Sequence, residues 1–504
     1  MRRYPIGIQD FSEMRTGNYL YVDKTPLIER LFFHGKYYFL SRPRRFGKSL
    51  FVSALEYLFQ GKKELFEGLY LYDKWDWTKT NPVIKISFSN IGHKLMGLEE
   101  AVDKKMNEIA LEYKVIFDGE SIDQKFKKLI ETLADKHGQV VVLIDEYDKP
   151  IIDYLGVNIE QAIKNREVLK AFYSILKDAD PFLKLVFITG VSKFSRVSIF
   201  SDLNNLIDIT VDADFSAICG ISQEELESNF TEELQKFDPE QIKKWYNGYS
   251  WDDGISVYNP FSLLSFFMKG KFKNYWFETG TPTFLINLSK NQYLYDFEGI
   301  KVEASGLSAY DIENLRLIPL MFQTGYLTIK EPEDMGIFTL SYPNEEVRQS
   351  YLNMLADSYI QDPVLSGRVW ASNLYKAIEV GDIDKLQSLF NTVFKSIPYE
   401  IWQKENEHFY HAIIHLTFRL LGIYVESQVQ TSDGRLDALV QTSQYVYAFE
   451  FKLDGSATEA LQQIKDKGYL QPYFHQQKTC IGIGLNFSTE TKKVQELLWE
   501  EIKE

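Results

Sequence analysis

The alternation of short apolar strands with helices in the first 215 residues constrains the fold of this chain more than any other feature. The predicted strands cover residues 37–40, 83–88, 140–144 and 185–189, and the predicted helices cover 49–59, about 99–136 and 166–178. Near-continuous apolar runs separated by helices are typical of a parallel sheet that is covered on both faces. We therefore predict an α/β domain over residues 1–215.

The rest of the chain has a different pattern. Short helices with aromatic-rich turns follow residue 222, and a helix near 311–322 precedes apolar runs at 325–329 and 338–342, for which a winged-helix-like module is one option. A helical stretch over 347–397 then leads to the last segment. There the predicted strands are 425–430, 436–441, 446–452 and 480–484, and the predicted helices are 405–421 and 457–469. We predict a mainly helical middle region over 216–395 and a second α/β domain over 396–504.

The overall composition excludes several classes of protein. A chain of 504 residues with 45% hydrophobic residues can fill two or three packed domains. Its longest aliphatic run, residues 140–144, is far shorter than the roughly 20 residues that span a bilayer. The first 13 residues contain no apolar export signal, and two cysteines are too few for a disulfide framework or a zinc cage. We expect a cytoplasmic protein with no membrane partner.

Charge is distributed unevenly along the chain. The sequence has 56 basic and 71 acidic residues, a net charge of −15, which argues against a general nucleic-acid coat protein. Residues 1–60 nevertheless hold ten basic and five acidic residues, a net charge of +5. An anionic ligand is therefore expected near the N-terminus rather than elsewhere.

A phosphate-binding loop is predicted between the first strand and the following helix. At such a turn, backbone N–H groups and a helix N-terminus face anionic oxygens. The predicted nucleotide contacts are Arg42, Arg44, Arg45, Gly47, Lys48 and Ser49. Lys48 would reach the β- and γ-phosphates of ATP, and Ser49 would bind Mg²⁺. Arg42 replaces the first glycine of G-x-x-x-x-G-K-[ST], so the loop either makes its first bend in another way or binds less tightly.

Acids end the apolar strand at residues 140–144, as they do in a Walker B strand. Asp145 would hold Mg²⁺, and Glu146 would polarise the water that attacks the γ-phosphate. The alternative is that both acids are solvated loop residues. Strand 185–189 would deliver Thr189 to the same edge of the sheet, together with Ser192 and Lys193, and one of these groups would sense the γ-phosphate. Arg196 is the nearest candidate for a trans-acting arginine, although a solvated surface arginine is the simpler interpretation.

Four separated segments carry a family resemblance. They are Tyr4–Phe11, Tyr21–Thr25, Arg42–Leu50 and Asp145–Pro150. These segments resemble the bacterial AAA-ATPase-like proteins, which carry a C-terminal nuclease-like domain of the PD-(D/E)XK superfamily. The resemblance covers nearly the whole chain, and an arginine in the place of Arg42 is usual in that family. It implies a P-loop ATPase related to signal-transduction ATPases, and it leaves the substrate open.

A second candidate site lies in the last domain. Asp437 lies near the start of one predicted strand, and Glu450 and Lys452 lie on the next, where a period of two places both side chains on one face. Two converging carboxylates bind a divalent cation, Mg²⁺ or Mn²⁺, and a neighbouring lysine can orient the attacking water. This spacing is similar to that of PD-(D/E)XK nucleases. Taken alone it is a weak signal, because surface strands often alternate charged and apolar residues.

Flanking helices add candidates to this second site. The preceding helix supplies Glu407, or alternatively Glu405, as a further metal ligand, and the following helix carries Gln463 and Tyr469, which resemble the Gln-and-Tyr helix of the RecB-like branch. Residues 396–504 hold ten basic and fifteen acidic residues, a net charge of −5, which is a poor electrostatic footprint for duplex DNA.

Together these observations predict an ATPase fused to a metal-dependent endonuclease that acts on DNA in processing or defence. The competing interpretation is a nucleotide-switched regulatory or scaffold protein whose nuclease-like domain only binds DNA or a partner. The sequence leaves open whether the chain forms a homo-oligomer.

Overall fold

The structure is a computed structural model of the chain. It describes residues 3–193, 199–200, 203–251, 255–276, 283–292, 294, 297–307, 315–333, 336–359, 366–396, 407–422, 426–429 and 437–503. The chain divides into two compact units, Met1–Phe284 with Phe297–Val347, and Leu285–Asp296 with Arg348–Glu504. The domain boundaries near residues 215 and 395 stay a prediction. No helix of the described residues is long and apolar enough to cross a membrane.

A parallel sheet forms the centre of the first unit, as the alternation of strands and helices predicts. Its strands are β1 (Tyr37–Ser41), β2 (Val83–Ser87), β3 (Val140–Asp145), β4 (Leu183–Gly190) and β5 (Ile207–Asp208). They are hydrogen-bonded in the order β2-β3-β4-β1-β5. Every residue of β1 and β3 is buried, because apolar helices cover the sheet.

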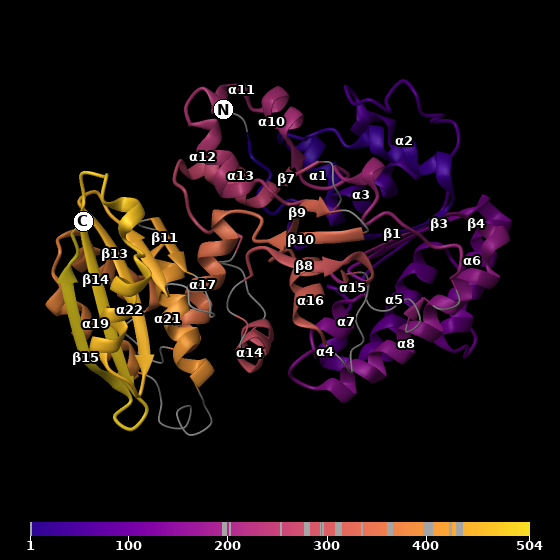
Figure 1. Cartoon of the computed structure of the whole chain (residues 1–504). Helices are drawn as coiled ribbons and strands as arrows, with labels where there is room; N and C mark the ends of the chain where they lie inside the picture. Colours follow the sequence, from indigo (N-terminus) through magenta and orange to yellow (C-terminus); the bar gives the residue numbers. More distant parts are fainter. Residues whose placement is uncertain are drawn as a thin grey trace. The chain divides into compact units, whose positions relative to one another are not determined.

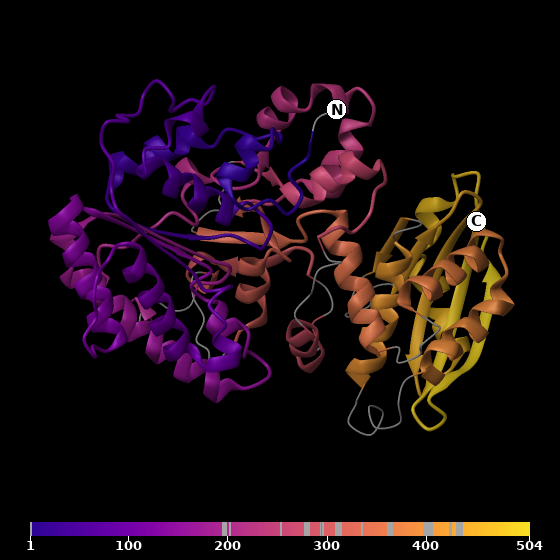
Figure 2. The ribbon, with the colours of Figure 1, turned by 180° about the vertical axis from the view of Figure 1, so that it is seen from behind.

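Helices lie on both faces of this sheet (Figures 1 and 2). In chain order they are α1 (Phe11–Thr16), α2 (Thr25–His34), α3 (Lys48–Phe59), α4 (His93–Met96), α5 (Leu98–Glu112), α6 (Ile122–His137), α7 (Lys149–Ile152) and α8 (Ile159–Asp178). The stretch predicted as helical over residues 99–136 consists of two helices, α5 and α6. The chain turns between them, where Lys114 and Gly119 have φ values of 56° and 77°.

The first unit continues with short helices around an aromatic core. The elements are β6 (Ile221–Ser222), α10 (Gln223–Asn229), α11 (Thr231–Leu234), α12 (Pro239–Tyr246), β7 (Val257–Tyr258) and α13 (Pro260–Lys269). Phe230, Tyr246 and Phe266 are fully buried in this core. The aromatic-rich turns of the sequence therefore serve mainly to pack these helices.

The predicted helix and hairpin are present near residue 325. Helix α16 (Leu317–Thr324) precedes strands β9 (Thr328–Glu333) and β10 (Ile337–Ser341), which pair antiparallel. Strand β8 (Ile300–Glu303), to which the sequence analysis assigns no element, joins them in the order β8-β10-β9, and α15 (Ala304–Leu307) follows it. The structure thus contains a helix followed by a small antiparallel sheet, and the winged-helix-like module stays a prediction.

The second unit contains a mixed sheet in the order β11-β12-β13-β14-β15. Its strands are β11 (Glu426–Val429), β12 (Ala438–Gln441), β13 (Tyr445–Leu453), β14 (Thr479–Ser488) and β15 (Lys493–Glu501), and only the β13–β14 pair is parallel among the described strands. Its helices are α17 (Glu345–Tyr359), α18 (Gly367–Glu379), α19 (Ile383–Ser396), α21 (Glu407–Leu421) and α22 (Ala457–Lys467). Helix α14 (Thr283–Asn291) and α17 each begin in the first unit and continue in the second.

Close packing of α22 on this sheet requires a glycine. A Cβ atom on Gly484 of β14 would lie 2.3 Å from the carbonyl oxygen of Ala457, at the start of α22. Because a side chain there would collide with backbone, glycine lets the helix approach the sheet. This approach sets the distance between α22 and the face of β13 that carries the second candidate site.

Candidate functional sites

The predicted phosphate loop borders a cavity of about 470 Å³. Gly47, with a φ of 98°, precedes α3, whose first residue is Lys48. The predicted loop and strand-end residues that line the cavity are Arg44, Arg45, Gly47, Lys48, Ser49 and Glu146. The strand-loop-helix setting that the sequence predicts is therefore present, and it brings the loop cations to the same space as a carboxylate.

Lys48 holds its ammonium group at the loop. The side chain is 5% exposed, and Nζ donates to the carbonyl oxygens of Arg42 at 2.8 Å and Pro43 at 2.9 Å. Burial lowers the pKa of Lys48, and the nearby Glu146 carboxylate opposes that shift. Neutral carbonyl oxygens compensate a buried cation only in part, so a phosphate oxygen is the stronger partner for this ammonium.

Arg45 has an incompletely satisfied guanidinium at the cavity. Its Nη1 atom is buried and has no hydrogen-bond partner among the described residues. The guanidinium carbon lies 3.8 Å from the ring centroid of Phe261, and burial together with the neighbouring Arg44 lowers the pKa of Arg45. A buried cationic donor without an acceptor fits an anionic ligand.

The structure does not bring the Arg42 side chain to the cavity. Arg42 is fully buried, and Nη1 donates to the carbonyl oxygens of Ser41 at 2.9 Å and Thr210 at 2.7 Å. Its guanidinium carbon also lies 4.1 Å from the ring centroid of Trp251. The bend that a glycine makes in the usual motif is therefore held here by an arginine that binds backbone carbonyls.

The two acids at the end of β3, Asp145 and Glu146, have different surroundings. Glu146 lines the cavity with a φ of 53°, a left-handed backbone that few non-glycine residues adopt. Burial raises its pKa, and Lys48 opposes the shift. Asp145 is 4% exposed and accepts a 2.6 Å hydrogen bond from Thr189 Oγ1. Thr189 thus contacts Asp145 and is not among the residues that line the cavity.

The remaining polar groups after β4 are used within the protein. The Ser192 hydroxyl donates to Asp148 Oδ2 at 2.6 Å, and Lys193 forms an ion pair with Asp208. The Lys193 N–H also donates to Gln323 Oε1 at 2.6 Å. These contacts give Ser192 and Lys193 structural partners, and Arg196 lies outside the described residues.

Residues that were not predicted to belong to the site also border the cavity. The segment Pro5–Gln9 lines it, as do Lys149 and Trp276. The Trp276 Nε1–H group donates to the Arg44 carbonyl at 3.1 Å and so supports the loop from outside. Pro5–Gln9 and Lys149 both fall within segments that carry the family resemblance, which was the available signal for them. Trp276 gave none, because it contacts the loop across 232 residues of sequence.

The second candidate site lies on the face of β13 that α22 covers. Ala438 of β12 pairs with Phe449 of β13, which places Asp437 beside Glu450. The Phe451 N–H group donates to Asp437 Oδ2 at 2.8 Å. The predicted alternation is confirmed, because Glu450 contacts Gln463 of α22 while Phe449 packs on Phe418 of α21, with ring centroids 4.8 Å apart.

Polar contacts link the remaining described residues of this site. Lys452 Nζ donates to Gln463 Oε1 at 2.7 Å and to Glu450 Oε1 at 3.4 Å, and the Gln463 amide donates to Glu450 Oε1. The Tyr469 side chain also forms a hydrogen bond with the Gln463 side chain. Four of the predicted groups, Glu450, Lys452, Gln463 and Tyr469, therefore form one network. Helix α21 begins at Glu407, whose side chain, like the whole of Glu405, lies outside the described residues.

Glu450 has the properties of a cation ligand. It is 3% exposed, and its Oε2 atom is buried with no hydrogen-bond partner among the described residues. Burial and the neighbouring Asp437 raise its pKa to about 7, and Lys452 opposes the shift. A buried carboxylate oxygen without a donor, next to a second carboxylate, fits a hard divalent cation.

Two family models match separate segments of the chain. A model described as a predicted AAA-ATPase matches residues 5–200. A model described as the PD-(D/E)XK nuclease superfamily matches residues 405–497. The first segment contains the phosphate loop with its strand-end acids, and the second contains the carboxylate network.

Two comparisons with individual proteins have very different strengths. A protein of Azotobacter chroococcum mcd 1, described as an uncharacterized protein in the vnfD 5′ region, is 40% identical over 510 residues, which cover 98% of each chain. The solved structure of Cdc6p from Pyrobaculum aerophilum is 12% identical with a TM-score of 0.22, and the match covers 69% of this chain and 93% of that one. A TM-score of this size carries no argument about fold or function.

Proposed function

Because this chain belongs to the family of AAA-ATPase-like proteins with a C-terminal domain of the PD-(D/E)XK nuclease superfamily, we propose that it hydrolyses ATP and cleaves DNA. ATP with Mg²⁺ would bind at the phosphate loop, and Mg²⁺ or Mn²⁺ would bind at Asp437 and Glu450. The proposed setting is DNA processing or defence in the cytoplasm.

The observation that supports ATP binding most strongly is the cavity that brings Lys48, Arg45 and Glu146 together. The buried Lys48 ammonium and the buried Nη1 atom of Arg45 favour a polyanion, because each phosphate oxygen can replace a neutral carbonyl or fill an unused donor. The N-terminus of α3 adds backbone N–H groups and the positive end of its dipole. Ser49, the second residue of α3, lines the same cavity.

Hydrolysis needs a group that orients and polarises water beside the γ-phosphate. Glu146 is suited to this role because its carboxylate lines the cavity and burial raises its pKa toward the range of an effective base. Ser49 and Asp145 supply oxygen ligands of the kind that Mg²⁺ prefers. When bound, Mg²⁺ would neutralise developing charge on the phosphates. Thr189 would orient Asp145 through their hydrogen bond.

For the second unit, the carboxylate network supports a cation-dependent hydrolytic site. Asp437 and Glu450 would hold the cation, which supplies Lewis acidity to a phosphodiester. Gln463 fixes the Glu450 carboxylate, and Lys452 lies at that carboxylate with an ammonium group that can donate to the attacked phosphate or to water.

A second candidate function is a nucleotide-switched regulator whose nuclease-like domain is inactive. Two observations favour it. The Lys452 ammonium is engaged by Gln463 and Glu450, and residues 396–504 carry a net charge of −5, which weakens the attraction for duplex DNA. A purified-protein assay with ATP, Mg²⁺ or Mn²⁺, and single- and double-stranded DNA separates the two functions.

Two substitutions test the ATPase proposal. Lys48→Ala removes a cation from the cavity and should abolish measurable ATP binding by calorimetry. Glu146→Gln should leave ATP binding intact and slow phosphate release by about 10²-fold or more. Lys104→Ala, an exposed lysine on α5, is the matched control and should behave as wild type. Equal ATP affinity in wild type and Lys48→Ala would contradict the proposal.

A further inference from the structure

One cation of the phosphate-loop cavity, Lys149, has no role in the proposed ATPase chemistry. It lines the cavity together with Arg44, Arg45, Lys48 and Glu146. These four cationic side chains and one carboxylate give the charged lining a net charge of +3. Such a surplus attracts a ligand with several negative charges, so Lys149 adds to this attraction and is not needed to balance Glu146.

Lys149 and Glu146 stand on the same tight turn after β3. The Lys149 N–H group donates to the Glu146 carbonyl at 3.0 Å. Asp148, which lies between them, anchors the turn to the segment after β4, because its Oδ2 atom accepts from the N–H group and from the hydroxyl of Ser192, both at 2.6 Å. The turn therefore holds the start of the Lys149 side chain at the same cavity as the carboxylate that is proposed to polarise the attacking water.

The ammonium group of Lys149 pairs with the buried carboxylate of Asp153, four residues further on. Asp153 Oδ2 also lies 3.1 Å from Lys94 Nζ and 3.3 Å from His93 Nε2. Burial alone would raise the pKa of Asp153, but its contacts with His93, Lys149 and Lys94 outweigh burial and hold that pKa below its usual range. One carboxylate is therefore shared by two lysines and a histidine.

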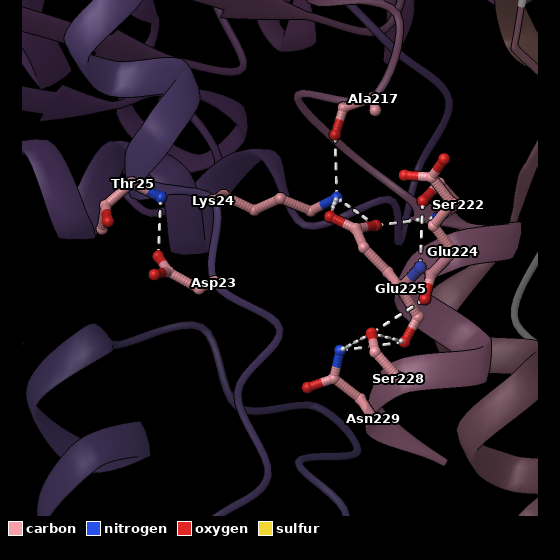
Figure 3. A network of polar contacts seen from close by, with 9 residues as sticks. All are labelled: Asp23, Lys24, Thr25, Ala217, Ser222, Glu224, Glu225, Ser228 and Asn229. Carbon is pink, nitrogen blue, oxygen red and sulfur yellow. Dashed lines mark hydrogen bonds and ion pairs between the residues drawn. The ribbon is translucent and has the colours of Figure 1, made fainter. Parts of the chain in front are cut away.

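Lys24 shows the opposite arrangement in the same unit (Figure 3). Its ammonium donates to the Ala217 carbonyl at 2.8 Å and to the two carboxylate oxygens of Glu225 at 2.6 and 2.7 Å, so all three ammonium hydrogens have acceptors. Among the described residues, Glu225 forms an ion pair with no second cation. Removing Lys24 would leave this carboxylate uncompensated, so Lys24 is committed to the fold.

Asp153 does not depend on Lys149 in this way. Lys94 carries a full positive charge and stays within ion-pair distance of the carboxylate when Lys149 moves away. Separating Lys149 from Asp153 therefore costs less than separating Lys24 from its carboxylate. A phosphate oxygen can take the place of Asp153, because ammonium groups form the same charge-assisted hydrogen bonds with phosphate as with carboxylate.

We propose that Lys149 leaves Asp153 to bind the γ-phosphate of ATP and that it is a catalytic residue of hydrolysis. Lys94 and His93 keep Asp153 compensated in that state. The inference rests on the proposed ATPase function and assigns its γ-phosphate contact. As water adds to the γ-phosphorus, the bond to the bridging oxygen breaks, Glu146 accepts a proton from the water, and ADP and inorganic phosphate form. Lys149 stabilises the negative charge of the γ-phosphoryl oxygens in this step.

The test compares ADP with the ATP analogue that has an imido group between the β- and γ-phosphates and is not hydrolysed. Binding of each to the full-length protein is measured by calorimetry at fixed Mg²⁺ and salt concentrations, and phosphate release from ATP is measured separately. Lys149→Met should weaken binding of the imido analogue by about tenfold or more and leave ADP binding within about twofold. It should slow phosphate release by about 10²-fold or more.

Two variants of the neighbouring residues should move the affinity in opposite directions. Asp153→Asn removes the competing partner of Lys149 and should tighten binding of the imido analogue by about threefold or more. Lys94→Met leaves Lys149 as the main cation of Asp153 and should weaken that binding by about threefold or more, although Lys94 is not among the residues that line the cavity. ADP binding should stay within about twofold in both. A purely structural role of the cluster would give losses in both variants.

The Lys94→Met variant also keeps the test decisive if Lys149→Met does not fold, because the Lys94 side chain is 56% exposed. Lys36→Met is the matched control. Lys36 pairs with Asp180 at 2.8 Å, its side chain is 32% exposed against 25% for Lys149, and it is not among the residues that line the cavity. This variant should bind both nucleotides and release phosphate as wild type does.

The outcomes separate this inference from the proposed function. If wild type binds neither nucleotide or hydrolyses no ATP, the proposed ATPase function is wrong and this inference falls with it. If wild type hydrolyses ATP but Lys149→Met weakens ADP and the imido analogue equally, or weakens neither, the γ-phosphate contact of Lys149 is wrong. If Asp153→Asn and Lys94→Met both weaken the imido analogue, or both leave it unchanged, the exchange of Lys149 between Asp153 and phosphate is overturned.

Discussion

The two candidate sites each contain a buried polar atom without a hydrogen-bond partner among the described residues, and the two atoms belong to groups of opposite charge. At the phosphate loop, the buried Nη1 of Arg45 has no acceptor, whereas in the second unit the buried Oε2 of Glu450 has no donor among the described residues. Burial disfavours the charged form of both groups, so it lowers the pKa of Arg45 and raises that of Glu450. Each site thus has an ionisable group with one buried atom that no described residue partners.

This difference indicates what each site is built to bind. A guanidinium with an unused donor at a cavity is stabilised by an anion such as a phosphate, and a carboxylate with an unused oxygen beside Asp437 is stabilised by a metal cation. The neighbouring residues carry the same charge as the group at each site. They are Arg44 and Lys48 at the first cavity and Asp437 at the second site. Substitutions that remove the charged groups of a site should therefore have the largest effects on ligand binding and activity.

The largest expected effect is the loss of DNA cleavage when a carboxylate of the second site is removed. Asp437→Ala or Glu450→Ala leaves a bound cation under-coordinated, so cleavage with Mg²⁺ or Mn²⁺ should fall below detection. The fold should survive, because the apolar face of β13 packs on α21 through Phe449 and Phe451. Nicking of a supercoiled plasmid measures the activity, and circular dichroism checks the fold.

The control for this experiment is Glu490→Ala, an exposed carboxylate in the same unit. It should cleave DNA at the wild-type rate. Cleavage that persists unchanged in both Asp437→Ala and Glu450→Ala would assign the activity to another site or to a contaminant.

A smaller effect is expected if the two sites are coupled. One chain holds a nucleotide site and a hydrolytic site, and uncontrolled cleavage would endanger the DNA of its own cell. A typical allosteric coupling would change DNA affinity by about 5- to 150-fold between the ATP-bound and the empty protein, and DNA would change ATP affinity by the same factor. Fluorescence anisotropy of labelled DNA with the Glu146→Gln variant, with and without ATP, measures this change in DNA affinity.

Salt must be held constant in that measurement, because salt alone shifts such affinities strongly. The double variant Lys48→Ala/Glu146→Gln is the control, since ATP should no longer change its DNA affinity. Superimposable curves for Glu146→Gln with and without ATP, together with unchanged nicking rates, would rule the coupling out.

The sequence predicted the parts of both units that depend on local patterns. The buried strands of the first sheet are continuous apolar runs, so their positions follow from period and length alone. The proximity of Asp437 and Glu450 was also predictable, because β12 and β13 are neighbours along the chain. In contrast, β15 was missed, because it is an edge strand with mostly exposed residues and has no apolar period.

Contacts across long stretches of sequence account for the remaining differences. Arg42 was predicted to contact the nucleotide, yet its guanidinium binds carbonyls 168 and 173 residues further on. Lys24 similarly meets Glu225 across 201 residues. No local pattern encodes such partners, since they depend on how the whole first unit folds.

A still smaller effect, on ATP binding, is expected when Arg42 is replaced. Arg42→Gly restores the glycine of the usual loop motif, but it removes a buried cation from three backbone carbonyls and from the face of Trp251. Because hydrogen bonds of a charged group contribute about 1.5–3 kcal/mol each, the loop should lose its bend, and ATP should bind at least about tenfold more weakly by calorimetry.

Trp251→Phe is the matched control, because it retains an aromatic face for the guanidinium and should change ATP affinity by less than about threefold. Tighter ATP binding in Arg42→Gly would contradict the supporting role of Arg42.

The smallest expected effect is a pH dependence of stability in the metal-free protein. In the folded chain the pKa of Glu450 is raised from 4.5 to about 7, so the folded state binds this proton more tightly than the unfolded state does. The stabilisation is present below about pH 4.5 and is lost as the pH rises through about 7. Scanning calorimetry in EDTA between pH 5 and 8 should show the unfolding temperature of the second unit falling, by roughly 2–4 °C for each kcal/mol lost.

Glu450→Gln isolates this contribution, because it keeps the shape of the side chain and cannot ionise. The difference between wild type and Glu450→Gln should grow with pH in EDTA. Mn²⁺ should reverse the trend for wild type alone, since a cation that binds the ionised carboxylate stabilises only the folded state that forms the site. Parallel pH curves for the two proteins would mean that other groups of the fold compensate the Glu450 carboxylate. The proposed contrast between Arg45 and Glu450 would then be wrong for Glu450.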